Sequence, residues 1–180
     1  MTMNREDTLA VFIDFQEKLM PVMFHKEELQ DKTCRLAKGL AVLEIPHIVT
    51  QQYTKGIGET IPEIAEAIGE FEPIDKTTFS CMSHVDFINQ LEIEAKKNII
   101  VCGIEAHICV QQTVEQLLGE GYNVYIPADC ISSRSQNDFL WAMERMEKAG
   151  AVVTTYESIL YELLKDSKAE GFREISKIVK

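Results

Sequence analysis

The chain has 180 residues, of which 46% are hydrophobic and 26% charged, a balance typical of a globular protein with a full core. Its formal net charge of -11 argues against nucleic acid or an anionic membrane as the main partner. No apolar run approaches the ~20 residues of a membrane span, and the first residues lack the organisation of a secretory signal. We therefore predict a single domain over residues 1–180.

Five cysteines are present, at Cys34, Cys81, Cys102, Cys109 and Cys130. An odd number without a secretory signal predicts free thiols in a reducing compartment, so we expect a cytoplasmic protein. No paired-cysteine motif and no HExxH spacing occurs in the sequence. We therefore predict no metal site and no cofactor.

Apolar runs alternate with amphipathic stretches along the whole chain. Strands are predicted over Thr8–Phe15, Pro46–Thr50, Asn98–Cys102, Asn123–Pro127 and Ala151–Thr155. Helices are predicted over Phe24–Leu43, Ile61–Ile68, Val85–Ala95, from about Cys109 to Gly119, and over Asp138–Lys148, Glu157–Lys165 and Phe172–Val179. This alternation predicts a three-layer α/β/α fold with a central, mainly parallel sheet.

Three details of this pattern are specific enough to test. The residues TKGIGE after the second strand are expected to form a Gly-containing loop, and Ala128–Ser135 a polar loop. Phe71–His84 has no period of 2 or 3.6 and is expected to be irregular. In the helix over Asp138–Lys148, Leu140, Met143 and Met146 are expected to face the core.

The stretch Lys97–Val110 (KNIIVCGIEAHICV) is the most informative part of the sequence. It places Cys109 after a buried strand and in the first turn of the following helix. Open α/β sheets usually bind ligands at this edge, and the helix dipole there favours a thiolate. Asp14 ends the first strand, so the two side chains are expected at the same edge of the sheet.

These positions suggest nucleophilic catalysis by Cys109. Asp14 would accept the thiol proton, Lys76 would hold the charges together, and amides at the start of the helix would bind an oxyanion. From position alone, plainer alternatives remain: a buried inert cysteine, a carboxylate that caps a turn and a solvated loop lysine.

Several other residues are candidates for roles at this site. Gln16 is a candidate substrate contact, with a surface polar residue as the alternative, and Phe79 a candidate apolar wall, with a core residue as the alternative. His107 lies two positions before Cys109 and so faces a different side of a helix, which argues against it as the catalytic base. Cys81 is a candidate substrate-lining or redox-sensitive thiol, and Cys102 is expected to be buried and inert.

Four segments resemble the isochorismatase-like cysteine hydrolases, and in particular the small isochorismatase-domain proteins. They are DFQ at Asp14–Gln16, KTTFSC at Lys76–Cys81, GIEAHICV at Gly103–Val110 and PADCISSR at Pro127–Arg134. The resemblance implies a Rossmann-like isochorismatase-type fold with an Asp-Lys-Cys triad, here Asp14, Lys76 and Cys109. It also implies a covalent acyl intermediate on Cys109.

The resemblance carries further implications for the surroundings of the site. A cis peptide bond at Ile104–Glu105 would turn the amides of Glu105 and Cys109 toward the oxyanion. The segment TQQYTKGIGE lacks the metal ligands of the family's nicotinamidases, which favours a metal-independent enzyme. Because the loop Gln51–Ile61 is short, and because family members are commonly oligomers, we expect a homo-oligomer whose neighbouring subunits complete the pocket.

The sequence thus predicts a metal-independent cysteine hydrolase that acts on a small amide or a related C–N substrate. The retained Cys109 favours C–N hydrolysis over cleavage of isochorismate. Two alternatives stay open: a non-catalytic scaffold or interaction protein with the same fold, and a thiol redox protein that uses Cys109 with Cys81.

Overall fold

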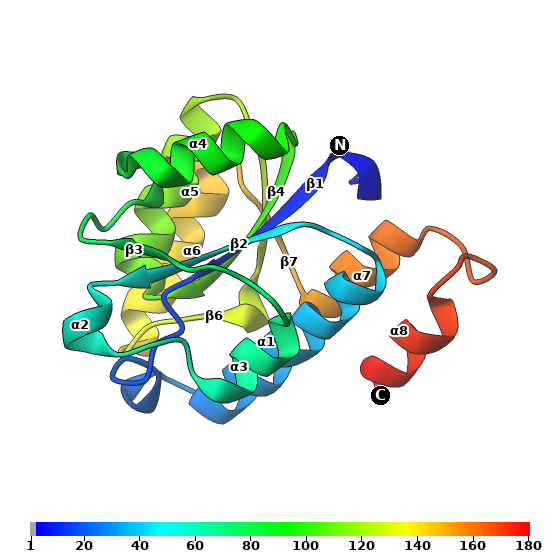
Figure 1. Cartoon of the computed structure of the whole chain (residues 1–180), viewed down its shortest axis with the longest axis horizontal. Helices are drawn as coiled ribbons and strands as arrows, with labels where there is room; N and C mark the ends of the chain where they lie inside the picture. Colours follow the sequence, from blue (N-terminus) through cyan, green and yellow to red (C-terminus); the bar gives the residue numbers. More distant parts are fainter. Residues whose placement is uncertain (1–2) are drawn as a thin grey trace.

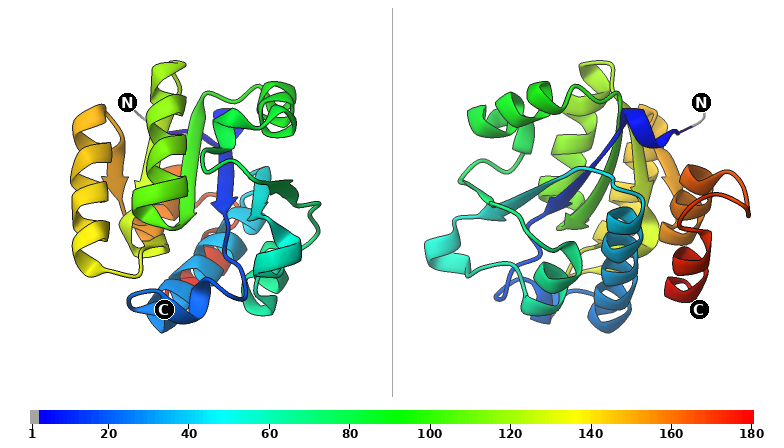
Figure 2. Two further views of the ribbon diagram at one scale, coloured as in Figure 1. Left: turned by 90° about the vertical axis from the view of Figure 1, so that its left-hand side faces the viewer. Right: turned by 45° about the vertical axis from the view of Figure 1, so that its right-hand side comes forward.

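The computed structural model describes residues 3–180 and shows a sheet between two layers of helices (Figures 1 and 2). The strands are β1 Thr8–Ile13, β2 His47–Gln52, β3 Ile74–Lys76, β4 Asn98–Ile104, β5 Asn123–Pro127, β6 Ile131–Ser132 and β7 Val152–Thr154. The α-helices are α1 Lys26–Val42, α2 Thr54–Ile57, α3 Pro62–Ile68, α4 Val85–Glu94, α5 Gln111–Gly119, α6 Gln136–Ala149, α7 Tyr156–Leu164 and α8 Phe172–Ile178.

The strand order of the sheet places one topological switch point at its centre. The order is β3-β2-β1-β4-β5-β7, with β6 paired to β4, and every strand pair is parallel. From β1 the chain builds outward through β2 and β3, then returns to the other side of β1 with β4. In such sheets the crevice beyond the carboxyl ends of the two central strands is the usual ligand site. The predicted α/β fold class is confirmed.

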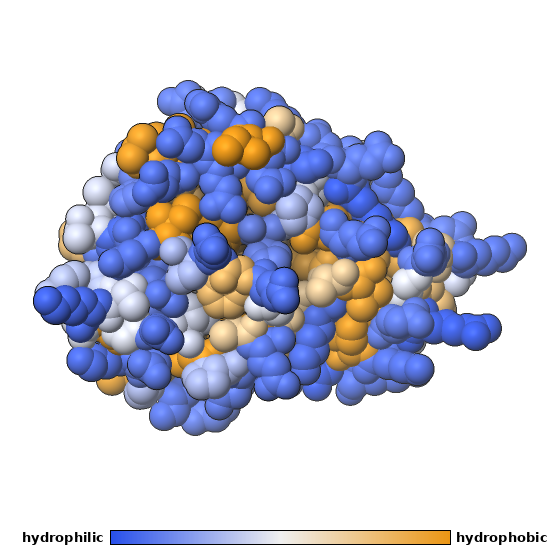
Figure 3. All heavy atoms as spheres, viewed as in Figure 1, coloured by the Kyte–Doolittle hydropathy of each residue, from blue (hydrophilic) through white to orange (hydrophobic). Residues whose placement is uncertain are grey.

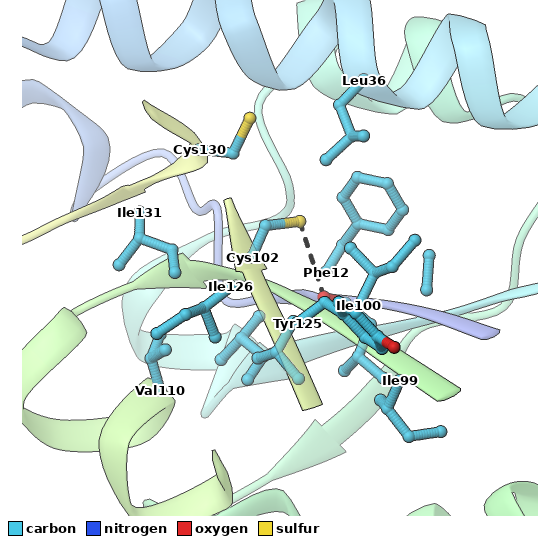
Figure 4. Close-up of a cluster of buried hydrophobic side chains, with 14 of the residues drawn as sticks. Phe12, Leu36, Ile99, Ile100, Cys102, Val110, Tyr125, Ile126, Cys130 and Ile131 are labelled. Atoms are coloured by element: carbon cyan, nitrogen blue, oxygen red, sulfur yellow. Dashed lines mark hydrogen bonds between the residues drawn. The ribbon is translucent and has the colours of Figure 1, made fainter. Parts of the chain in front are cut away.

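The two helical layers bury the sheet on both faces. Helix α1 contacts α3, α7 and α8 on one face, and α5 contacts α6 in the other layer, which also holds α4 (Figure 2). All six residues of β1 and all seven of β4 are buried, as expected for strands covered on both sides. Between β1 and α1, Phe12 meets Leu36, with Cys102 and Cys130 beside them (Figure 4). Cys102 is therefore the buried thiol that the sequence predicted.

Two strands were missed because they are very short. The segment Phe71–His84, expected to be irregular, contains β3, and the loop Ala128–Ser135 contains β6. β3 has three residues and β6 two, too few to show a period of two in the sequence. Both gain their hydrogen bonds from a longer neighbour, β3 from β2 and β6 from β4.

Two local expectations were wrong. TKGIGE is not simply a loop, since its first four residues form the single turn of α2. In α6, Met143 and Met146 are buried, but Leu140 is 53% exposed. Helix α6 contacts mainly α5, the π-helical turn Ala106–Val110 and β7, so its buried stripe is narrower than the apolar periodicity suggested.

Gly103 allows the central strands to approach one another. It lies in β4 opposite Ile13 of β1 and has φ of +146°. A Cβ atom at this position would lie 2.4 Å from the carbonyl oxygen of Ile13. Glycine is therefore required here by both backbone conformation and space. Its partner Ile13 is the residue immediately before Asp14.

We expect Gly103→Ala to lower the free energy of unfolding by about 1–3 kcal/mol, as overpacking against rigid backbone does. Urea denaturation followed by circular dichroism measures it. Gly119→Ala is the matched control, because Gly119 is helical and has no atom within 4 Å of the added Cβ. That change should be neutral or stabilising by up to about 1 kcal/mol, so equal losses in the two variants would contradict the expectation.

The molecular surface is mostly polar, with scattered apolar patches. Figure 3 shows hydrophilic residues over most of one face and several apolar groups between them. The large apolar side chains with the greatest exposure include Ile93 and Trp141. Every helix in residues 3–180 is too short or too polar to cross a lipid bilayer.

Candidate active site

A buried ion pair lies at the switch point between β1 and β4. Asp14 follows β1 with φ of +55°, a backbone conformation uncommon for any residue except glycine. Its Oδ2 atom lies 2.7 Å from Nζ of Lys76, and both side chains are completely buried. Its Oδ1 atom accepts a hydrogen bond of 2.8 Å from the hydroxyl of Thr50, at the end of β2. Both oxygens of the carboxylate are thus held by donors from neighbouring strands.

Lys76, the last residue of β3, is surrounded by oxygen acceptors. Its ammonium lies 2.7 Å from Oε1 of Gln52 and 3.2 Å from the carbonyl oxygens of Thr78 and Phe79, in addition to Asp14. Burial by itself lowers the pKa of Lys76, but the negative charge of Asp14 and the nearby thiols outweigh burial, so the net pKa is raised. Lys76 therefore stays charged, and its three protons are all taken by protein acceptors.

Cys109 lies beside this pair in a π-helical turn, Ala106–Val110, that leads into α5. Its side chain is close enough to Asp14 and Lys76 for both to influence its titration, and the residue is 7% exposed. Burial is the largest cause that raises the pKa of the Cys109 thiol, and the charge of Asp14 adds to it, while Lys76 acts in the opposite direction.

The protonation of Cys109 therefore differs from the expectation drawn from the helix dipole. The sequence places the thiol in the first turn of an α-helix, where a thiolate is favoured. In the structure that turn is π-helical, and burial beside a carboxylate keeps the thiol protonated at neutral pH. A thiol in this state needs a base before it can attack, and the side chain of Asp14 is adjacent.

Cys81 is a buried neighbour of the ion pair. It is completely buried, and burial raises the pKa of its thiol to about 11. Its backbone N–H donates to the hydroxyl of Thr113, and its sulfur lies 3.9 Å from the hydroxyl of Thr50. This burial argues against a role for Cys81 in lining a substrate pocket.

The two candidate substrate contacts, Gln16 and Phe79, lie in different environments. Gln16 is completely buried. Its side-chain N–H group donates to the carbonyl oxygens of Gln52 and Gly58, and its side-chain oxygen accepts the backbone N–H of Gln52. It therefore ties the β2–α3 connection to the end of β1, rather than lying at the surface. Phe79 is 56% exposed, so its side chain forms neither part of the core nor an enclosed wall within one chain.

The peptide bond between Ile104 and Glu105 is cis. The carboxylate of Glu105 accepts hydrogen bonds from the backbone and the guanidinium of Arg134, at 3.0 and 3.1 Å. His107, the residue set aside as a base, has Nδ1 2.9 Å from the hydroxyl of Ser133. The segment between β4 and α5 is thus held by side chains that follow β6.

Comparison with known proteins identifies the family of the chain. The sequence model of the isochorismatase domain family matches residues 8–158 of this chain. A curated relative, isochorismatase domain-containing protein 2 of Danio rerio, is 36% identical over 98% of this chain and 89% of its own length. The chain belongs to the isochorismatase family.

Two solved structures illustrate how similar the fold is. One, described as a MAR1 ribonuclease from Caenorhabditis elegans, has a TM-score of 0.93 and 38% identity, and covers 99% of this chain and 92% of its own. The YcaC gene product of Escherichia coli, described as an octameric hydrolase of unknown specificity, has a TM-score of 0.93 and 20% identity, over 98% and 90% of the two chains. This second likeness concerns the fold alone.

As a member of the isochorismatase family, the chain has the fold of a family of hydrolases. Asp14, Lys76 and Cys109 come together in it, and their joint role as a catalytic triad is a prediction. Within residues 3–180, no group of three or more His, Cys, Asp or Glu side chains is arranged to hold a metal ion.

Sequence analysis missed three side chains at this site of the isochorismatase fold: Thr50, Gln52 and Thr113. Thr50 lies in β2, two residues before its end, and donates to Asp14. Gln52 is the last residue of β2, and its side-chain oxygen accepts from Lys76. Their place at the carboxyl end of a predicted strand was the available signal. Thr113 gave none, because a threonine one helical turn after a cysteine is unremarkable until the partner segment is known.

Proposed function

We propose that this protein is a metal-independent cysteine hydrolase that cleaves a small amide or a related C–N bond through an acyl intermediate on Cys109. One observation carries the proposal: the thiol of Cys109 lies beside the carboxylate of Asp14, which is paired at 2.7 Å with the buried ammonium of Lys76. A general base next to an unactivated nucleophile is the recurring arrangement of covalent acyl transfer. Membership of the isochorismatase family, a family of hydrolases, supports the proposal.

In the first half of the reaction, Cys109 attacks the substrate carbonyl carbon. As the S–C bond forms, the thiol proton passes to Asp14 and the carbonyl oxygen becomes an oxyanion. When the C–N bond breaks, Asp14 returns that proton to the leaving nitrogen, which departs as a neutral amine or ammonia. A thioester remains on Cys109, and Asp14 is again a carboxylate.

In the second half, a water molecule attacks the thioester. Asp14 accepts a proton from the water as the new C–O bond forms, and gives it to the sulfur of Cys109 as the C–S bond breaks. The product is a carboxylic acid, and the thiol is restored. Lys76 keeps its protons throughout and acts by charge, because its donors are already bound to protein oxygens.

The backbone amides of Glu105 and Cys109 are the proposed donors to the oxyanion. Both belong to the segment that turns from β4 into the π-helical turn, where the peptide bond before Glu105 is cis. One such donor typically contributes about 3–4 kcal/mol to the stabilisation of the transition state.

Labelling with an electrophile tests the proposal without knowledge of the substrate. We expect iodoacetamide to modify Cys109 faster than the four other cysteines, and Asp14→Asn to slow that modification at neutral pH by at least about tenfold. Peptide mapping by mass spectrometry over time measures both. Equal labelling of Cys109 with and without Asp14 would count against a base at this position. A panel of small primary amides, ureido compounds and esters then seeks the substrate.

The redox alternative requires Cys81 to reach a disulfide with Cys109. Complete burial and a pKa of about 11 make Cys81 a poor attacking thiol. We expect no Cys81–Cys109 disulfide after treatment with peroxide, as judged by non-reducing peptide mapping. The scaffold alternative gains support if the panel gives no turnover and Cys109 reacts like an ordinary cysteine.

A ribonuclease activity, as in the description of the C. elegans neighbour, is opposed by charge. With a formal net charge of -11, this chain repels an RNA backbone. An RNA oligonucleotide is included in the substrate panel to test this expectation. Cleavage of it that is lost in Cys109→Ala would replace the amide proposal.

We also propose that the protein is a homo-oligomer with a cytoplasmic location. The exposed apolar side chains of Ile93, Trp141 and Leu140 support the first part, since an interface would cover such groups. Five free thiols agree with the second. Light scattering during gel filtration measures the assembly.

A further inference from the structure

Cys81 occupies a position that the mechanism above leaves unused. It is completely buried between the two halves of the site, with Thr50 on one side and Thr113 on the other. Both threonines are also completely buried. A threonine hydroxyl has one proton to donate and lone pairs to accept, so each can link two partners in a fixed direction.

The first link runs to the proposed base. The hydroxyl of Thr50 donates its proton to Oδ1 of Asp14 at 2.8 Å. Its lone pair is then left to face the thiol of Cys81, whose sulfur is 3.9 Å away. Without Thr50, the buried carboxylate of Asp14 would keep Lys76 but lose the donor on its other oxygen.

The second link runs to the proposed nucleophile. The hydroxyl of Thr113 donates to the carbonyl oxygen of Cys109 at 2.7 Å and accepts the backbone N–H of Cys81 at 3.0 Å. A bond from a threonine to the carbonyl four residues earlier is common in helices and means little by itself. Here the same hydroxyl also binds a separate segment, the one that follows Lys76 in the chain.

We propose that Thr50, Cys81 and Thr113 form a positioning brace that fixes the carboxylate of Asp14 relative to the backbone of Cys109. The inference rests on the proposed function and extends it to three residues that do not touch the substrate. It assigns Cys81 a structural role through its backbone amide and its size, in place of a redox or substrate-lining role.

The neighbours of Asp14 make the brace testable by substitution. Its carboxylate faces Lys76 from β3, Thr50 from β2, Cys109 from the π-helical turn and Cys81 from the segment after β3. Among these neighbours, Thr50 is the donor that can be removed without changing the charge.

The experiment measures the rate at which iodoacetamide modifies Cys109 at pH 7. In Thr50→Val the carboxylate of Asp14 loses the donor that orients it, so the rate should fall by about fivefold, the effect expected when one hydrogen bond is lost. Thr50→Ser keeps the donor and should restore the wild-type rate. Thermal unfolding confirms that each variant is folded.

Thr113→Val gives the complementary result, because it acts on the nucleophile rather than on the base. The rate of modification should again fall by about fivefold, the effect expected when one neutral hydrogen bond is lost. Cys34→Ala is the matched control, since its thiol bonds the carbonyl of Glu63 and belongs to no part of the brace, and it should leave the rate at Cys109 nearly unchanged.

Two results would overturn the brace: a rate in Thr50→Val that equals the wild-type rate, or one in Thr50→Ser that falls as far as in Thr50→Val. Asp14→Asn separates this failure from a failure of the proposed function. If Asp14→Asn slows the modification and Thr50→Val does not, the brace alone is wrong. If Asp14→Asn leaves the rate unchanged, Asp14 is not the base, and the proposed function and the brace both fail.

Discussion

Replacement of Cys109 by alanine should abolish turnover of any substrate found in the panel, with a loss of at least about 10⁴-fold in kcat. Nucleophiles of covalent hydrolases show losses of this size, because the remaining groups cannot form the intermediate. The fold should survive, since Cys109 is held by its backbone and neither Asp14 nor Lys76 loses its partner. Steady-state kinetics and thermal unfolding measure the two quantities.

Cys34→Ala is the control for this experiment. Cys34 is a half-buried thiol on α1, and its sulfur lies near the carbonyl of Glu63, away from the ion pair. It should keep wild-type activity and a similar stability. A Cys109→Ala protein as active as the Cys34→Ala protein would remove the thiol from the reaction, and with it the acyl intermediate.

The meeting of Asp14 and Cys109 could be predicted because it follows from topology. Both follow buried parallel strands, and the carboxyl ends of such strands share one edge. Lys76 was harder to place from pattern, because β3 has three residues and no period to detect. Its position came from the resemblance of KTTFSC to a family motif rather than from any local signal of a strand.

The protonation of Cys109 and the roles of the threonines could not be predicted in the same way. A helix start favours a thiolate, but the opposing effects of burial and of a carboxylate depend on distances that the sequence does not contain. Thr50 and Thr113 matter through hydrogen bonds to residues 36 and 4 positions away and through their shared neighbour Cys81. The prediction that Leu140 faces the core was wrong for a related reason. Periodicity identifies the apolar stripe of a helix, but it does not show which element packs against that stripe.

Replacement of Lys76 by methionine should lower the free energy of unfolding by about 3–5 kcal/mol at pH 7. The substitution keeps much of the side-chain volume but leaves the completely buried carboxylate of Asp14 without its cation, and an uncompensated buried charge has this cost. The pKa of Lys76 is raised in the folded protein, so its contribution to stability is present in full at neutral pH and lost only as the pH rises above the usual lysine range. Urea denaturation at pH 7 measures the loss.

The double variant Asp14→Asn/Lys76→Met distinguishes loss of charge balance from loss of side-chain packing. With both charges removed, most of the penalty should disappear, because a buried pair replaced by neutral groups is often close to neutral in stability. A double variant as unstable as the sum of the two single ones would mean that Lys76 contributes through its packing and its bonds to Gln52, Thr78 and Phe79. Charge balance with Asp14 would then not be the reason that a lysine is buried at this site.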